Sequence, residues 1–156
     1  MQERKAGMVE TAPGEPQGPG GAHAGKGDKS GARCLCEASE VLIFACSGAS
    51  NVGQLANEAA LRLREAGMGN MYCTAGIGGH VRGLVEGARS ARLLVGIDGC
   101  GVGCVRKCLE GEGLSPGVYM VISDELKVRK GYVRPEERDV AEAVRLLTSR
   151  LREHVR

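Results

Sequence analysis

Residues 41–63 read VLIFACSGASNVGQLANEAALRL and contain the pattern that decides the fold. The first six residues form a continuous apolar run, which is typical of a strand covered on both faces in a parallel sheet. A turn of small residues follows. Asn51 is then in position to cap a helix, with Gln54 three residues further on in capping-box register. The apolar face of this helix consists of Val52, Leu55, Ala56, Ala59 and Leu63. This strand–turn–helix unit predicts an α/β fold.

The same alternation of strand and helix continues along the chain. Strands are expected at residues 41–46, 92–98 and 117–123, and GNMYCTAG (69–76) predicts a short strand followed by a turn. Helices are expected over residues 79–90, from Cys100 to the glycines at 111 and 113, and from Pro135 onward. Such alternation predicts a three-layer α/β/α sandwich around a mostly parallel four-stranded sheet. The preferred strand order is 2-1-3-4, as in flavodoxin-like and Rossmann-like folds.

Composition limits the domain organisation and the partners. The 156 residues suit one domain, expected over residues 40–156, after a Gly/Pro-rich tail at residues 1–33 that is expected to be disordered. The net charge of +2 and the scarcity of aromatic residues argue against nucleic acid as a partner. No secretory signal or membrane span is visible, so we expect a cytoplasmic protein away from membranes, with an unidentified small molecule or protein as partner.

Four of the seven cysteines fall at the ends of predicted strands. Cys46 ends the first strand, Cys73 ends the second, and Cys100 follows the third by two residues. Cys104 is expected one turn further along the same helix face as Cys100. In the predicted strand order these ends meet at one edge, so the four thiols should face one crevice. Four thiolates favour tetrahedral zinc over an iron–sulfur cluster, and helix N-termini would help to hold their charge.

Three stretches resemble those of the DGC-domain family of putative zinc-binding proteins. They are CSGASNVGQLANEAALRL, GMGNMYCTAGIGG and LVGIDGCGVGC, and the Asp-Gly-Cys motif of the family corresponds to residues 98–100. The resemblance covers residues 40–132. It implies that Cys46, Cys73, Cys100 and Cys104 are the zinc ligands. It does not imply a catalytic residue or a particular biochemical role, so a structural, a metal-handling and a sensory role all stay open.

Two other chemistries compete with the zinc hypothesis. Cys46 lies between a strand and a helix N-terminus, which is where a cysteine nucleophile or a phosphocysteine carrier holds phosphate. Position 52 is valine, so the arginine of a C-x5-R phosphatase loop is missing. Thiol redox chemistry is the second alternative, although a Cys100–Cys104 disulfide across one helical turn has poor geometry.

The remaining candidates have simpler interpretations. Asp98 is expected to cap the helix that starts near Cys100, with the orientation of a ligand or the binding of a cation as the alternative, and Cys108 is expected to be a core residue. His80 is expected either to approach the crevice or to be a solvated residue at a helix start. Arg82, Lys107, Lys127 and Lys130 are interpreted as surface charges. Cys34 and Cys36 belong either to the tail or to an extra thiol pair.

Overall fold

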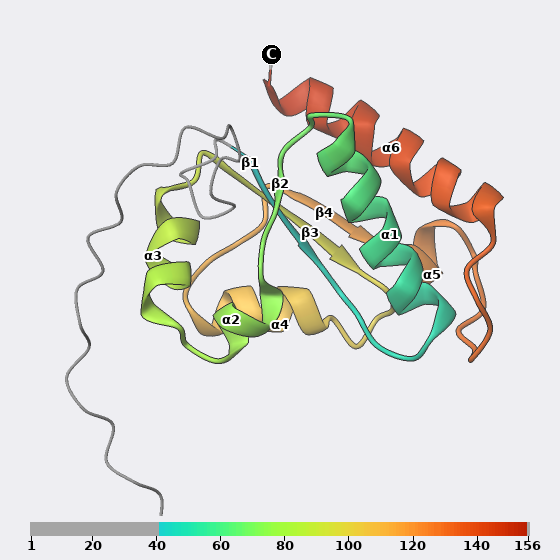
Figure 1. The fold of residues 1–156 in the computed structure, drawn as a ribbon, viewed down its shortest axis with the longest axis horizontal. Coiled ribbons are helices and arrows are strands. Elements are labelled where there is room, and N and C mark those ends of the chain that lie inside the picture. Colours follow the sequence, from blue (N-terminus) through green and yellow to red (C-terminus); the bar gives the residue numbers. More distant parts are fainter. Residues whose placement is uncertain (1–40, 156) are drawn as a thin grey trace, which may run out of the picture. The chain divides into compact units, whose positions relative to one another are not determined.

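The computed structural model describes residues 41–155. Residues 1–40 and 156 lie outside the described part, and so do the predicted tail, Cys34 and Cys36. The described chain forms a four-stranded parallel sheet in the order β2-β1-β3-β4, which confirms the predicted class and strand order. The strands are β1 (Val41–Ala45), β2 (Asn70–Met71), β3 (Leu93–Asp98) and β4 (Val118–Val121). The arrows of β1, β3 and β4 point toward the same end of the sheet (Figure 1).

The central pair β1 and β3 is aligned over its full length, from Val41 opposite Leu93 to Ala45 opposite Ile97. Side chains alternate across a strand, so each strand supplies both faces of the sheet. Ile43 packs into one hydrophobic cluster and Phe44 into the other. The apolar run VLIFA is continuous because both faces are covered by helices.

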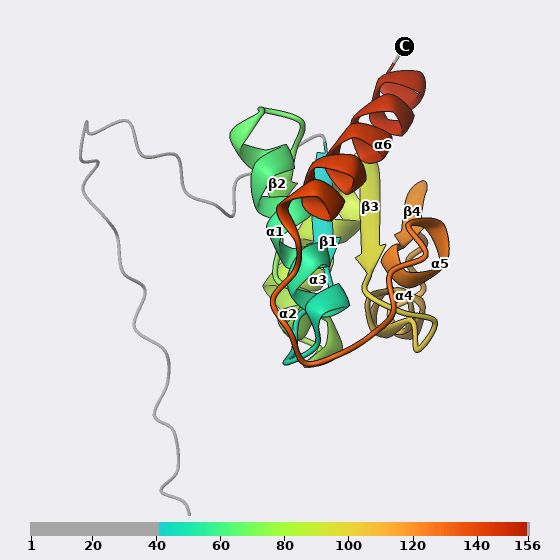
Figure 2. The same ribbon diagram turned by 90° about the vertical axis from the view of Figure 1, so that its right-hand side faces the viewer.

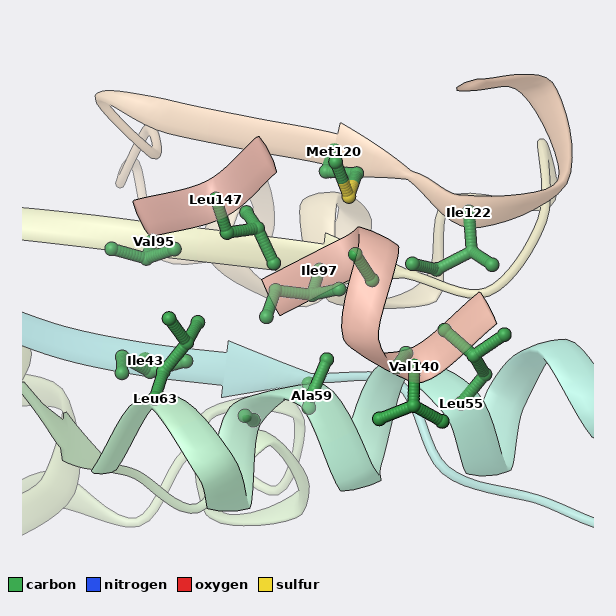
Figure 3. Close-up of a cluster of buried hydrophobic side chains, with 14 of the residues drawn as sticks. Ile43, Leu55, Ala59, Leu63, Val95, Ile97, Met120, Ile122, Val140 and Leu147 are labelled. Atoms are coloured by element: carbon green, nitrogen blue, oxygen red, sulfur yellow. The ribbon is translucent and has the colours of Figure 1, made fainter. Parts of the chain in front are cut away.

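One face of the sheet is covered by α1 (Asn51–Glu65) and α6 (Glu137–Val155), together with the short α5 (Ile122–Glu125) (Figures 1 and 2). Figure 3 shows how Leu55, Ala59 and Leu63 of α1 point at the strands and at α6. Leu63 and Leu147 are fully buried in this cluster. Burial of such a side chain contributes roughly 1.5–3 kcal/mol, so this layer fixes α1 on the sheet.

The opposite face is covered by α2 (Thr74–Gly78), α3 (Arg82–Ser90) and α4 (Cys104–Gly111). Ile77 and Leu109 are fully buried against Phe44. The rings of Phe44 and Tyr72 meet edge to face with 5.6 Å between their centroids. The two helical layers and the sheet make the three-layer sandwich.

Several local boundaries differ from the sequence prediction. Ser50, and not Asn51, caps α1, because the Ser50 hydroxyl accepts a hydrogen bond from the amide of Gly53. The expected turn at residues 74–76 is part of helix α2, and the end of the fourth predicted strand forms helix α5. Within residues 41–155, no helix combines the length and hydrophobicity needed to span a membrane.

Candidate metal centre

The ends of β1 and β3 bring three thiols to one edge of the sheet. Cys46 follows β1 directly, and its amide donates a hydrogen bond of 2.8 Å to the carbonyl of Ile97 on β3. Burial raises the pKa of the Cys46 thiol, and the charges of Cys104, Asp98 and Cys100 raise it further. A backbone hydrogen bond from Gly99 lowers the pKa of the Cys46 thiol. The thiols of Cys100 and Cys104 are therefore among the groups that act electrostatically on Cys46.

Gly99 permits the close packing of this edge on α1. A Cβ atom at position 99 would lie 2.8 Å from the carbonyl carbon and oxygen of Val52 and from the nitrogen of Gly53. Carbon atoms normally approach to about 3.5–4.0 Å, so no side chain fits there without a shift of backbone. The first turn of α1 therefore leaves space only for glycine at the central position of the Asp-Gly-Cys motif.

Cys100 and Cys104 do not share a helix face, which corrects the sequence prediction. Helix α4 begins at Cys104, and Gly103 before it adopts a left-handed conformation with φ of 68°. Cys100 lies in the turn between β3 and α4, where it is partly buried, while Cys104 is exposed. The glycines at 101 and 103 delay the start of the helix, because glycine adopts turn and left-handed conformations at little cost.

Asp98 has the helix-capping role that the sequence predicted. Its carboxylate is fully buried and accepts hydrogen bonds from the amides of Val105, at 2.9 Å, and Arg106, at 3.1 Å. It also accepts a hydrogen bond of 2.8 Å from the Tyr119 hydroxyl. Burial and this contact with Asp98 raise the pKa of Tyr119 well above the usual tyrosine value. The carboxylate neutralises the helix N-terminus beside the thiols.

Cys73 reaches the same edge from the neighbouring strand. It follows β2 by two residues and caps α2, because its sulfur accepts a hydrogen bond of 3.3 Å from the amide of Gly76. The hydroxyl of Thr74 bonds to the carbonyl of Ala45, the last residue of β1, at 3.1 Å. Cys73 is exposed. It therefore lies at the edge where Cys46 begins the β1–α1 turn.

These donors form no preassembled coordination sphere. Among the residues that the structure describes, no three Cys, His, Asp or Glu side chains are arranged to hold a metal ion together. The thiols are carried by segments without regular structure at residues 46–50 and 99–103, and by the first residue of α4. The type of donor suits a thiophilic metal.

Cys108 and His80 are the two other candidates among the described residues. Cys108 is partly buried against the second hydrophobic cluster; burial is the main cause that raises the pKa of its thiol, and the charges of Cys104 and Asp98 raise it further. This agrees with a packing role. His80 is exposed with a left-handed φ of 56°, and its ring nitrogen Nδ1 contacts the carboxylate of Glu112, at the end of α4.

Lys130 is exposed, as expected of a surface charge, but it also makes a contact that the sequence did not reveal. The ammonium nitrogen of Lys130 lies 3.5 Å from the sulfur of Cys100. It belongs to a segment that we call the basic loop, residues 127–134, which also contains Lys127, Arg129 and Arg134. In Figure 2 this loop runs from α5 past the start of α1 and then up to α6. No local sequence pattern signals the contact, because it depends on packing between distant segments.

The fold is an α/β domain with candidate thiols in the turns at the carboxyl ends of its strands. The model of the DGC domain matches residues 42–146, and the chain belongs to this family. The chain is also similar to the "Anaerobic and virulence modulator AnvM" of Pseudomonas aeruginosa strain PAO1, with 45% identity over 111 residues that cover 69% of this chain and 85% of that protein. No solved structure matches the chain.

Proposed function

We propose that this chain is a zinc-binding domain whose ligands are the thiolates of Cys46, Cys73, Cys100 and Cys104. The observation that carries the proposal is the gathering of cysteines from three separate turns at one sheet edge, with Cys46, Cys100 and Cys104 within electrostatic reach of one another. Cysteines that only filled the core would have no reason to collect at strand ends. Four thiolates are a common ligand set for structural zinc.

Metal binding requires the donor segments to move together, because they hold no ready coordination sphere as the chain stands. A bound zinc ion would remove the cost of ionising the partly buried Cys46, since coordination keeps a thiolate deprotonated. The site would then tie together the turns after β1, β2 and β3.

We infer a regulatory role and not an enzymatic one. Asp98, whose charge acts on Cys46, is fully buried and accepts three hydrogen bonds, so it cannot serve as a general base. The similar Pseudomonas protein is named a modulator, which supports a sensory role for a site of this kind. The alternative in which Cys46 is a nucleophile is weaker, because burial raises the pKa of its thiol and reduces the thiolate fraction at neutral pH.

The test is a metal and thiol analysis of protein purified without oxygen. Wild type should hold about one zinc ion per chain, as four-thiolate structural sites do. Each of Cys46→Ser, Cys73→Ser, Cys100→Ser and Cys104→Ser should lose most of the metal. Cys108→Ser is the matched control, because Cys108 lies on the same helix as Cys104 but packs against the core. Full zinc retention by Cys100→Ser would overturn the four-ligand site, and iron with a visible absorption band would indicate an iron–sulfur centre instead.

A further inference from the structure

The basic loop brings a cation directly to one of the candidate thiols. Lys130 is an exposed residue, yet its ammonium group lies within 3.5 Å of the Cys100 sulfur, thirty positions away in sequence. Cys100 is partly buried and packs against the larger hydrophobic cluster, which Val128 of the basic loop also contacts. The lysine therefore approaches the thiol from the solvent side of a partly apolar environment.

Asn51 fixes the backbone of the basic loop on both sides of Lys130. Its side-chain amide nitrogen donates to the carbonyl of Arg129 at 3.0 Å, and its side-chain oxygen accepts from the amide of Gly131 at 2.7 Å. The backbone amide of Asn51 also donates to the carbonyl of Gly131 at 2.9 Å. Asn51 is only 6% exposed, so water competes little for these bonds. We call this arrangement the Asn51 clamp.

The turn that carries Cys100 is tied to the same region. The carbonyl of Gly99 accepts a hydrogen bond of 3.1 Å from the amide of Ser123, in the α5 segment that leads into the basic loop. Both partners of the Lys130–Cys100 contact are therefore anchored through their backbones. A long flexible side chain whose Cα position is fixed loses less entropy when it forms a contact than one on a mobile loop.

Zinc with four thiolates carries a formal charge of minus two, which favours a nearby cation. We infer that Lys130 is the charge-compensating residue of the thiolate site and that the Asn51 clamp holds it there. The inference rests on the proposed zinc function. Hydrogen bonds from a charged donor to a thiolate exceed ordinary surface ion pairs in strength, so loss of the lysine charge should weaken zinc binding by about fivefold to tenfold.

The experiment measures the zinc dissociation constant of the full chain by competition with a chromophoric chelator. Lys130→Met removes the charge and keeps the length of the side chain, and Lys130→Glu reverses the charge. Arg129→Met and Arg129→Glu are the matched controls, because Arg129 is the adjacent exposed cation and contributes only its carbonyl to the clamp. Far-UV circular dichroism and thermal unfolding verify that each variant folds.

The inference is supported if zinc affinity falls fivefold to tenfold in Lys130→Met and further in Lys130→Glu, while the affinity of Arg129→Met changes by less than about twofold. Equal affinities for wild type and Lys130→Met would overturn the role of Lys130 and leave zinc binding intact. Equal losses of zinc affinity at positions 129 and 130 would also overturn the role of Lys130. They would show that the overall positive charge of the basic loop matters and not a specific contact. A wild-type chain that binds no zinc would overturn the proposed function and this inference together.

Discussion

Gly99→Ala should force the Asp-Gly-Cys turn away from helix α1. The added Cβ would lie 2.8 Å from three backbone atoms of the Val52–Gly53 peptide, and backbone cannot rotate out of the way as a side chain can. Relief requires the turn and the helix to separate by roughly 1 Å, judged from ordinary carbon contacts of about 3.5–4.0 Å. Overpacking typically costs about 1–3 kcal/mol, and we expect the upper end of this range because α1 is pinned by the core.

The assay is urea unfolding at neutral pH, with Gly101→Ala as the matched control. An added Cβ at Gly101 meets nothing within 4 Å, and both substitutions remove similar backbone freedom from the unfolded chain. For a urea m-value of about 1.5 kcal/mol/M, a loss of about 3 kcal/mol lowers the midpoint of Gly99→Ala by about 2 M. Gly101→Ala should stay within about 0.5 kcal/mol of wild type or be slightly more stable.

The same substitution should also affect the thiols. The backbone hydrogen bond from Gly99 lowers the pKa of Cys46 against the effect of burial, and displacement of the turn weakens this bond. In metal-free Gly99→Ala protein, Cys46 should therefore react more slowly with a thiolate-specific alkylating agent than it does in wild type. If Gly99→Ala and Gly101→Ala unfold at the same urea concentration, the steric explanation for Gly99 is wrong.

Three further substitutions test the polar contacts around the site. Asp98→Asn should lower the free energy of unfolding by about 2–3 kcal/mol, because the asparagine NH2 group would face backbone N–H groups of α4 that now donate to a carboxylate. Urea unfolding curves indistinguishable from those of wild type would contradict this. Tyr119→Phe should cost about 1–2 kcal/mol at pH 8 for the lost hydrogen bond to Asp98. The folded-state pKa of Tyr119 is raised, so the stabilisation by its hydroxyl is complete below the unfolded tyrosine pKa of about 10. This stabilisation declines as pH rises toward the folded-state pKa. Between pH 9 and pH 11, the free energy of unfolding should therefore fall less for Tyr119→Phe than for wild type. Asn51→Ala should lower the free energy of unfolding by about 2 kcal/mol and increase proteolysis within the basic loop, because it leaves two backbone groups of that loop unpaired. An unchanged rate of cleavage would count against the Asn51 clamp.

The main features of the fold follow from local patterns, and for that reason the sequence predicts them. Runs such as VLIFA and LLVGI are too apolar for a sheet with a solvent-exposed face, and the helices between them impose parallel strands. The structure confirms the order 2-1-3-4. The strand order in turn places the turns that carry Cys46 and Cys100 at the same end of the sheet, because β1 and β3 are adjacent and parallel.

What the sequence could not predict depends on single backbone conformations and on distant contacts. The left-handed Gly103 shifts the start of α4 to Cys104, and a glycine-rich stretch gives no local sign of which glycine adopts that conformation. The five-residue helix α2 is capped by a cysteine sulfur, which is not among the usual capping groups. Lys130 is recognisable only once Asn51 and the basic loop are seen together.

The Asn51 clamp also bears on the order in which the molecule can assemble. It joins residues separated by 80 positions, so the chain must close a very long loop before these bonds form. During synthesis, β1, α1, β3 and all the cysteines of the described chain emerge before Lys130 does. A nascent chain that stops short of residue 129 therefore has its thiols but neither the clamp nor the cation beside Cys100. Completion of the thiol site is thereby tied to completion of the chain, and the clamp is expected among the last contacts to form and the first to open under mild denaturant.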